Sequence, residues 1–139
     1  MGLDSTIVLH TQSAVDSNEL PDWVWLEKRD DSTNDYVLVY FRKSYGFRHM
    51  MNRILEKYKI QVDPMGGKYD LPNKINFIDD LQNGLYNFLL NPDDWDDESQ
   101  IFYMDTCYKT IAQAILNLTW MKQYMEKHPT VYLEYIDSF

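Results

Sequence analysis

The sequence predicts an α+β protein in which a small antiparallel sheet, with three N-terminal strands and one C-terminal strand, carries three helices on one face. Three observations lead to this fold class. Apolar residues alternate with period two near the N-terminus and recur with helical spacing further along. The expected strands do not alternate regularly with helices, which disfavours a doubly wound parallel sheet. With 139 residues, 45% of them hydrophobic and 15% aromatic, residues 1–139 suit a single globular domain with a sizeable core.

Three segments near the N-terminus have the pattern of strands. In residues 5–10, Ile7 and Leu9 alternate with Val8 and His10. Residues 22–28 and residues 36–41 are rich in aromatic and β-branched side chains, which favour extended structure. The connector between these two, residues 29–35, is polar and rich in turn-forming residues. We therefore expect the pair to form a β-hairpin with a long loop.

The apolar spacing changes to that of a helix after the third strand. Ser44 is a suitable N-cap, and the residues that follow predict an amphipathic helix to about residue 59. Its apolar face consists of Phe47, Met50, Met51, Ile54, Leu55 and Tyr58. Residues 63–67, which include a proline and two glycines, are expected to form a turn.

Two further helices and a last strand are expected in the C-terminal half. Asn76 is interpreted as the N-cap of a helix whose apolar residues continue to Leu89, and Asn91-Pro92 ends that helix. Apolar residues recur with helical spacing between residues 100 and 127. Residues 131–136 then have the composition of a strand.

Charge is distributed unevenly along the chain, whose net charge is −9. Residues 1–35 contain eight acidic and two basic side chains, residues 36–74 three acidic and eight basic, and residues 75–139 eleven acidic and three basic. The bases on or beside the first expected helix are Arg42, Lys43, Arg48, Arg53, Lys57 and Lys59. They are either the solvated back of a core helix or an anion-binding surface, for which Arg48, Arg53 and Lys57 are the candidates.

An acidic loop between the second and third expected helices is the main candidate site. Residues 93–98 place one tryptophan among five carboxylates. Such a loop can dock on a basic protein surface, because an aromatic side chain supplies a buried anchor while the acids steer the encounter. The alternative is an exposed acidic turn that only keeps the protein soluble. The candidate partner-binding residues are Asp94, Trp95, Asp96, Asp97 and Tyr103.

The chain carries no familiar catalytic or metal-binding motif. His10, His49 and His128 do not stand at metal-ligand spacing, and Cys107 is the only cysteine. We therefore expect no catalytic residue, no metal site and no cofactor. A small hydrolase that uses paired carboxylates such as Asp79-Asp80 stays open as a third alternative.

The expected location is the cytoplasm. The N-terminal residues lack the basic start and long apolar stretch of a secretion signal, and a single thiol suits a reducing compartment. No apolar run approaches the length that spans a bilayer, so no membrane partner is expected.

Short motifs in several places resemble uncharacterised small proteins that are common in bacteriophage and prophage genomes. The matching segments are Met1-Gly2-Leu3-Asp4, Tyr40-Phe41-Arg42-Lys43 before a helix, Tyr108-Lys109-Thr110-Ile111, and the aromatic tail at residues 132–139. The chain departs from their pattern at Ser5, where methionine is usual, and at His49, which falls one place later than the family's histidine. The resemblance implies a phage-type accessory protein in the host cytoplasm and implies no activity.

Taken together, these features predict an acidic accessory protein that acts by binding another protein. The expected partner is a host protein with a basic surface, and the expected action is stoichiometric inhibition of a nucleic-acid-handling or defence enzyme. The alternative is nucleic-acid or anion binding through the basic helix at residues 42–59, although the acidic flanks oppose a polyanion. The sequence leaves the oligomeric state open.

Overall fold

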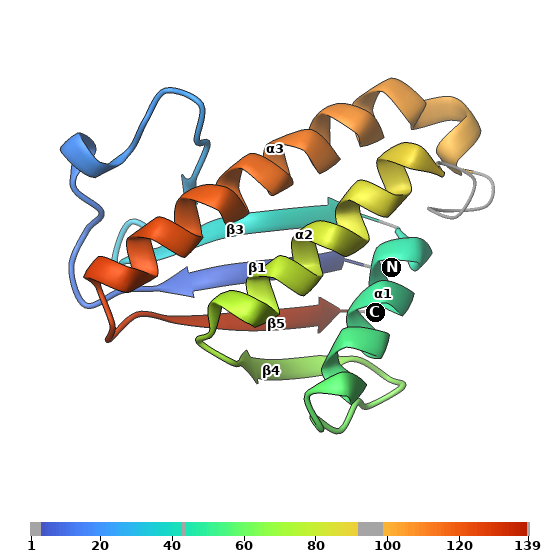
Figure 1. The fold of residues 1–139 in the computed structure, drawn as a ribbon, viewed down its shortest axis with the longest axis horizontal. Helices are drawn as coiled ribbons and strands as arrows, with labels where there is room; N and C mark the ends of the chain where they lie inside the picture. Colours follow the sequence, from blue (N-terminus) through green and yellow to red (C-terminus); the bar gives the residue numbers. More distant parts are fainter. Residues whose placement is uncertain (1–3, 43, 92–98, 139) are drawn as a thin grey trace.

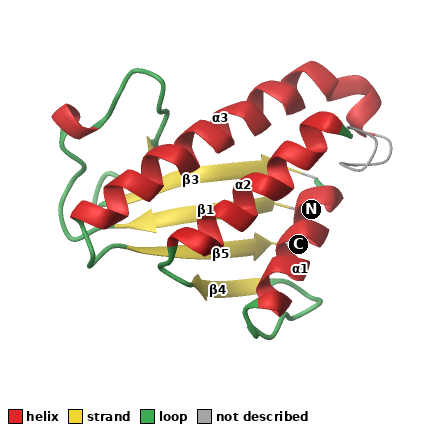
Figure 2. Ribbon diagram, viewed as in Figure 1, coloured by secondary structure: helices red, strands yellow, loops and turns green. Residues whose placement is uncertain are grey.

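One antiparallel sheet and three α-helices make up the fold in a computed structural model that describes residues 4–42, 44–91 and 99–138 (Figures 1 and 2). The strands are β1 (Asp4–His10), β2 (Glu27–Lys28), β3 (Asp35–Arg42), β4 (Gly67–Leu71) and β5 (Tyr132–Ser138). The helices are α1 (Tyr45–Lys57), α2 (Ile75–Leu90) and α3 (Ser99–Lys127), and a short 3-10 helix, η1, covers Ser17–Glu19. The predicted α+β class is confirmed.

The sheet has the strand order β2-β3-β1-β5-β4, so the first and last strands of the chain are neighbours near its centre. Helix α2 packs against α3, α3 contacts β3, and α1 contacts α2. Figure 1 shows α2 and α3 crossing the sheet on the viewer's side. The expectation that all three helices cover the same face stays a prediction.

Strand β4 corrects the predicted order of elements, because residues 67–71 were not expected to form a strand. The segment is short and begins with glycine, so its own sequence gives a weak strand signal. Its place in the sheet comes from pairing with β5, in which Gly67 lies opposite Asp137 and Leu71 lies opposite Leu133. Residues 67–71 therefore form a strand because β5, which is distant in sequence, supplies the pairing partner.

The predicted helices are found with small changes at their ends. Ser44 caps α1 as expected, and its hydroxyl accepts a hydrogen bond from the Phe47 amide at 3.2 Å. The predicted cap of α2 is wrong: the helix begins at Ile75, Lys74 is its N-cap residue, and no side chain caps it. The Lys74 carbonyl accepts hydrogen bonds from the Phe77 amide at 3.1 Å and the Ile78 amide at 3.4 Å, so the first turn of α2 closes without a side-chain cap.

Gly84 allows α1 and α2 to approach each other closely. A Cβ atom at residue 84 would lie 2.3 Å from the Met50 sulfur and 2.9 Å from its Cγ. Glycine in a helix costs about 1 kcal/mol relative to alanine. Here that cost is offset because Met50 is buried against the glycine face of α2.

One ion pair ties the first helix to the last strand inside the protein. Arg48 Nε donates to Asp137 Oδ2 at 2.9 Å, and Arg48 Nη2 donates to the Pro64 carbonyl at 2.8 Å. The Asp137 side chain is fully buried, and that of Arg48 is 11% exposed. A buried carboxylate needs its cation, because an uncompensated charge in a low dielectric is costly.

Aromatic side chains at the C-terminal end of α3 hold the N-terminal loop. The rings of Trp120, Tyr124 and His128 stack in sequence along the helix. Trp120 Nε1 donates to the Glu19 carbonyl at 2.7 Å, and His128 Nε2 lies 2.8 Å from Glu19 Oε2. The loop that precedes β2 is therefore fixed to α3 before it reaches the sheet.

The buried ion pair gives the first prediction. Replacing Arg48 with leucine leaves the Asp137 carboxylate buried without its cation, so Arg48→Leu should lower the free energy of unfolding by about 3 kcal/mol or more. Urea denaturation at neutral pH measures the loss. Arg53→Leu, on the exposed side of the same helix, is the matched control and should change stability little. The double variant Arg48→Leu/Asp137→Leu should recover most of the loss; a double variant as unstable as the single one would contradict this account.

Candidate functional site

The acidic loop of the sequence-based prediction lies outside the described residues. Residues 94–97 fall in the gap between α2 and α3, and the side chain of Tyr103 is also outside the description. The partner-binding role of Asp94, Trp95, Asp96 and Asp97 therefore stays a prediction.

The three candidate anion-binding residues do not form one surface. Arg48 is buried against Asp137. Arg53 and Lys57 are exposed and line a shallow groove of about 300 Å³ between α1 and α2. Asp80 lies in the same groove, 3.0 Å from the Lys57 ammonium, so part of the positive charge there is already balanced.

Tyr58 keeps the carboxylate of Asp80 in that groove ionised. Its hydroxyl donates to Asp80 Oδ2 at 2.7 Å. This hydrogen bond, followed by the one from Lys57, holds the pKa of Asp80 below its usual range. The same bond, together with burial and nearby negative charge, raises the pKa of Tyr58 to about 12. An ionised Asp80 disfavours a second anion beside Arg53 and Lys57.

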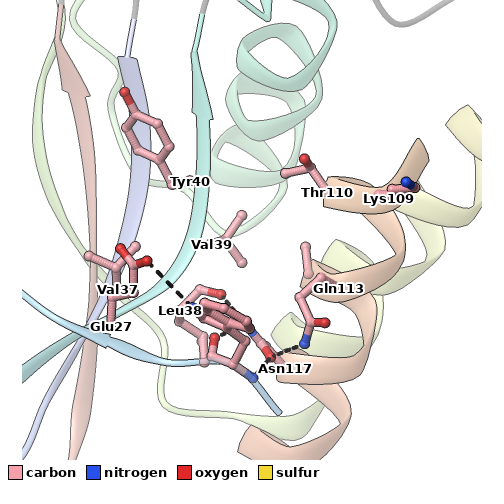
Figure 3. Close-up of a pocket in the computed structure, with 11 residues that line it drawn as sticks. Glu27, Val37, Leu38, Val39, Tyr40, Lys109, Thr110, Gln113 and Asn117 are labelled. Atoms are coloured by element: carbon pink, nitrogen blue, oxygen red, sulfur yellow. Dashed lines mark hydrogen bonds between the residues drawn. The ribbon is translucent and has the colours of Figure 1, made fainter. Parts of the chain in front are cut away.

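A larger groove of about 450 Å³ runs along strand β3, between the chain at Trp25–Glu27 and helix α3 (Figure 3). Its lining residues are Trp25, Glu27, Val37, Leu38, Val39, Tyr40, Lys109, Thr110, Gln113, Ala114 and Asn117. Figure 3 shows Tyr40 and Val37 on one side of β3, while Val39 faces Thr110 and Gln113 on the other side. The groove therefore wraps around the edge of the strand.

Beyond Val37, no described strand pairs with this edge of β3, because β2 is short. Of the described strands, only β2 lies on the side of β3 away from β1, and it pairs Glu27 with Val37 and Lys28 with Tyr36. The sequence predicted a longer strand over residues 22–28, and this prediction is wrong for residues 22–26. Val39 and Tyr40 consequently lie beyond the end of the β2 ladder.

The buried amide of Asn117 on α3 explains why β2 ends where it does. Its Oδ1 accepts from the Trp25 amide at 3.0 Å, and its Nδ2 donates to the carbonyls of Trp25 at 2.8 Å and Leu38 at 2.9 Å. Gln113, one helical turn earlier, donates to Asn117 Oδ1 at 2.9 Å and to the Trp23 carbonyl at 3.0 Å. Backbone groups that a strand would satisfy are thus satisfied by a helix side chain.

A β-bulge forms the floor of the groove. The pairing of β1 with β3 shifts between Ile7, which lies opposite Val39, and Val8, which lies opposite Val37. Leu38 is the extra residue, and both Leu38 and Val39 are buried. A bulge bends and twists its strand locally, so β3 changes direction at the point where β2 ends.

Two exposed aromatic side chains and two opposite charges border the groove. Trp25 is 67% exposed and Tyr40 is 45% exposed. Trp25 Nε1 donates to Glu27 Oε1 at 3.4 Å, and Lys109 lies on the α3 side (Figure 3). Tyr40 donates to Asp4 Oδ1 at 3.2 Å, and burial followed by this bond raises the pKa of Tyr40. A ligand in this groove could contact the backbone of β3, the flat rings of Trp25 and Tyr40, and the charged groups of Glu27 and Lys109.

The most conspicuous titratable cluster lies across three strands, away from this groove. His10 Nδ1 is 2.7 Å from Asp35 Oδ1, His10 Nε2 is 3.1 Å from Glu134 Oε1, and the ring stacks on Tyr132. Because the two carboxylates lie on opposite sides of the imidazole, they tie neighbouring strands together and do not converge on one point. Within the described residues, no group of three or more His, Cys, Asp or Glu side chains is arranged to hold a metal ion.

Comparison of the chain with protein-family models, curated proteins and solved structures gives no match. Among the described residues, no helix combines the length and apolar character needed to cross a membrane.

Sequence reasoning missed Asn117 and Trp25 as the residues that shape the groove. Asn117 falls among the apolar residues of α3 between Ala114 and Leu118, and Gln113 precedes it by four positions. Two amide side chains with that spacing beside an apolar stripe indicate a buried polar contact. The signal identifies the contact and cannot identify its partners, because Trp25 and Leu38 are distant in sequence.

The Asn117 contact gives the second prediction. Asn117→Leu leaves the backbone groups of Trp25 and Leu38 without partners, so the free energy of unfolding should fall by about 3 kcal/mol. Hydrogen exchange should show reduced protection of the Trp25 amide. Asn83→Leu makes the same change at an exposed position of α2 and should leave both quantities nearly unchanged. Full protection of the Trp25 amide in Asn117→Leu would rule out the proposed role.

The Tyr58 contact gives the third prediction. Tyr58→Phe removes the hydrogen bond that most lowers the pKa of Asp80, so that pKa should rise toward the ordinary value of 3.8. The native contribution of Asp80 is present above the unfolded-state pKa and is lost as pH falls through the lower folded-state pKa. Stability at neutral pH should therefore fall by about 1 kcal/mol, and its loss on acidification should become shallower. Carboxyl NMR titration measures the pKa; Tyr86→Phe, at an exposed tyrosine of α2, is the control.

Proposed function

We propose that the protein acts by binding another protein, and that an extended segment of this partner adds to the edge of β3 in the groove beneath α3. The observation that carries the proposal is the β3 edge itself. Beyond Val37 it continues past the end of β2, and the exposed Trp25 and Tyr40 border it. Proteins usually cover or charge such edges because they are templates for pairing with another chain.

The shape of the groove supports a chain in extended conformation. A strand added to a sheet gains affinity from main-chain hydrogen bonds and specificity from pockets for alternate side chains. Here β3 supplies the main-chain groups, while Val39 and Thr110 line one side and Tyr40 lines the other.

The finer parts of the expected function are also proposals. Because the described loop between β1 and β3 is acidic, a partner with a basic surface is favoured by electrostatic steering. The resemblance to phage proteins supports a host protein as the partner, with stoichiometric inhibition as the outcome and the cytoplasm as the place. The partner-binding role predicted for the acidic residues 93–98, which lie outside the described residues, is part of the same proposal.

A peptide library displayed on yeast and selected against the immobilised protein tests this proposal. We expect enriched sequences with alternating apolar residues, and amide NMR shifts centred on Val39 and Tyr40 when the synthetic peptides bind. Thr110→Trp, which fills the groove, should weaken binding by about tenfold or more. Gln123→Trp places the same side chain at an exposed position of α3 and should not weaken it. Absence of enrichment, or shifts confined to another surface, would refute the proposal.

A further inference from the structure

We infer that the segment bound at β3 carries an arginine or lysine at its end beside Trp25, and that Trp25 and Glu27 together recognise this cation. The inference rests on the proposed function, since it concerns the residue preference of the same groove. It commits to one occupant, an extended peptide segment of a partner protein with a basic terminal residue.

The end of β2 determines where an added strand must stop. Glu27 occupies the ladder position opposite Val37, and the chain before it is drawn to α3 by the bonds between Trp25 and Asn117. A strand that pairs with β3 at Val39 and Tyr40 therefore lies in line with β2, and one of its ends abuts the Trp25–Glu27 segment. The residue at that end has Trp25 and Glu27 as its nearest side chains.

The side chains of Trp25 and Glu27 form a suitable receptor for a cation. The Trp25 indole is 67% exposed, and its Nε1 bond to Glu27 Oε1 keeps the ring beside the carboxylate. A guanidinium or ammonium group over the indole face is attracted by the ring quadrupole. The Glu27 carboxylate, which forms no ion pair with any described residue, can accept hydrogen bonds from the same cation.

The chain segment that contains Trp25 and Glu27 has a net negative charge. Between residues 11 and 35 the chain has seven acidic and two basic side chains. Lys109 is exposed on the α3 side of the groove, away from Glu27 (Figure 3). The groove thus has a carboxylate near one end and an ammonium group on its other wall, which favours one orientation of the bound peptide.

Short capped peptides of alternating threonine and valine, each with arginine or its neutral isostere citrulline at one end, test the inference. Two arginine peptides are compared, one with arginine at the N-terminal end and one with arginine at the C-terminal end. We expect the tighter-binding of the two to bind about tenfold more tightly than the citrulline peptide of the same design, a difference of about 1.4 kcal/mol. Glu27→Gln and Trp25→Ala should each remove most of this difference. Trp23→Ala, at an exposed tryptophan that does not line the groove, should preserve it. Titrations by NMR report the site and confirm that each variant is folded.

The possible results separate the inference from the proposed function. Equal affinities for arginine and citrulline peptides, with shifts at Val39 and Tyr40, would overturn the cation preference and leave strand addition intact. Shifts elsewhere, or no binding by any peptide of the library or of this series, would overturn both. A dimer in sedimentation experiments that is lost in Thr110→Trp would also overturn the inference, because a second copy would then occupy the edge.

Discussion

The arrangement of β2, β3 and α3 depends on the buried amide of Asn117. A single side chain bonds the backbone on both sides of Trp25 and the carbonyl of Leu38, which are groups that a longer β2 would have satisfied. Such groups must be paired when buried, because each unpaired one costs about 1–3 kcal/mol. By pairing them with a helix, the chain ends the ladder early. The groove is a direct result of that exchange.

An unpaired strand edge can bind a partner, but it can also pair with other chains and cause aggregation. Several features of the structure limit such unwanted pairing. The edge is short, it follows a bulge at Leu38, and α3 packs against β3. Bulges and covering helices are common means of preventing indiscriminate pairing. The exposed aromatic groups that remain, Trp25 and Tyr40, are concentrated where the edge is accessible. If a partner segment pairs with this edge as we propose, the limited access restricts which segments can fit.

The fold class and most elements were predictable from the sequence, because apolar periodicity directly reports which side of an element is buried. The apolar face of α1 is an example: Phe47, Met51 and Leu55 are all buried. Strand β4 could not be predicted, since only its pairing with β5 defines it. The groove was missed for the same reason, because local preference favours a strand at Trp25 and a contact with a distant helix overrides it.

The position of β5 has a consequence for how the protein is made. This strand is the last in sequence, yet it separates β1 from β4 in the sheet. During synthesis on the ribosome, β1 and β3 can pair early, whereas β4 can join the sheet only after residues 132–138 have emerged. Until then, β1 and β4 lack the strand that lies between them. Unpaired strand edges favour aggregation, so we expect chaperone binding to matter most during that interval.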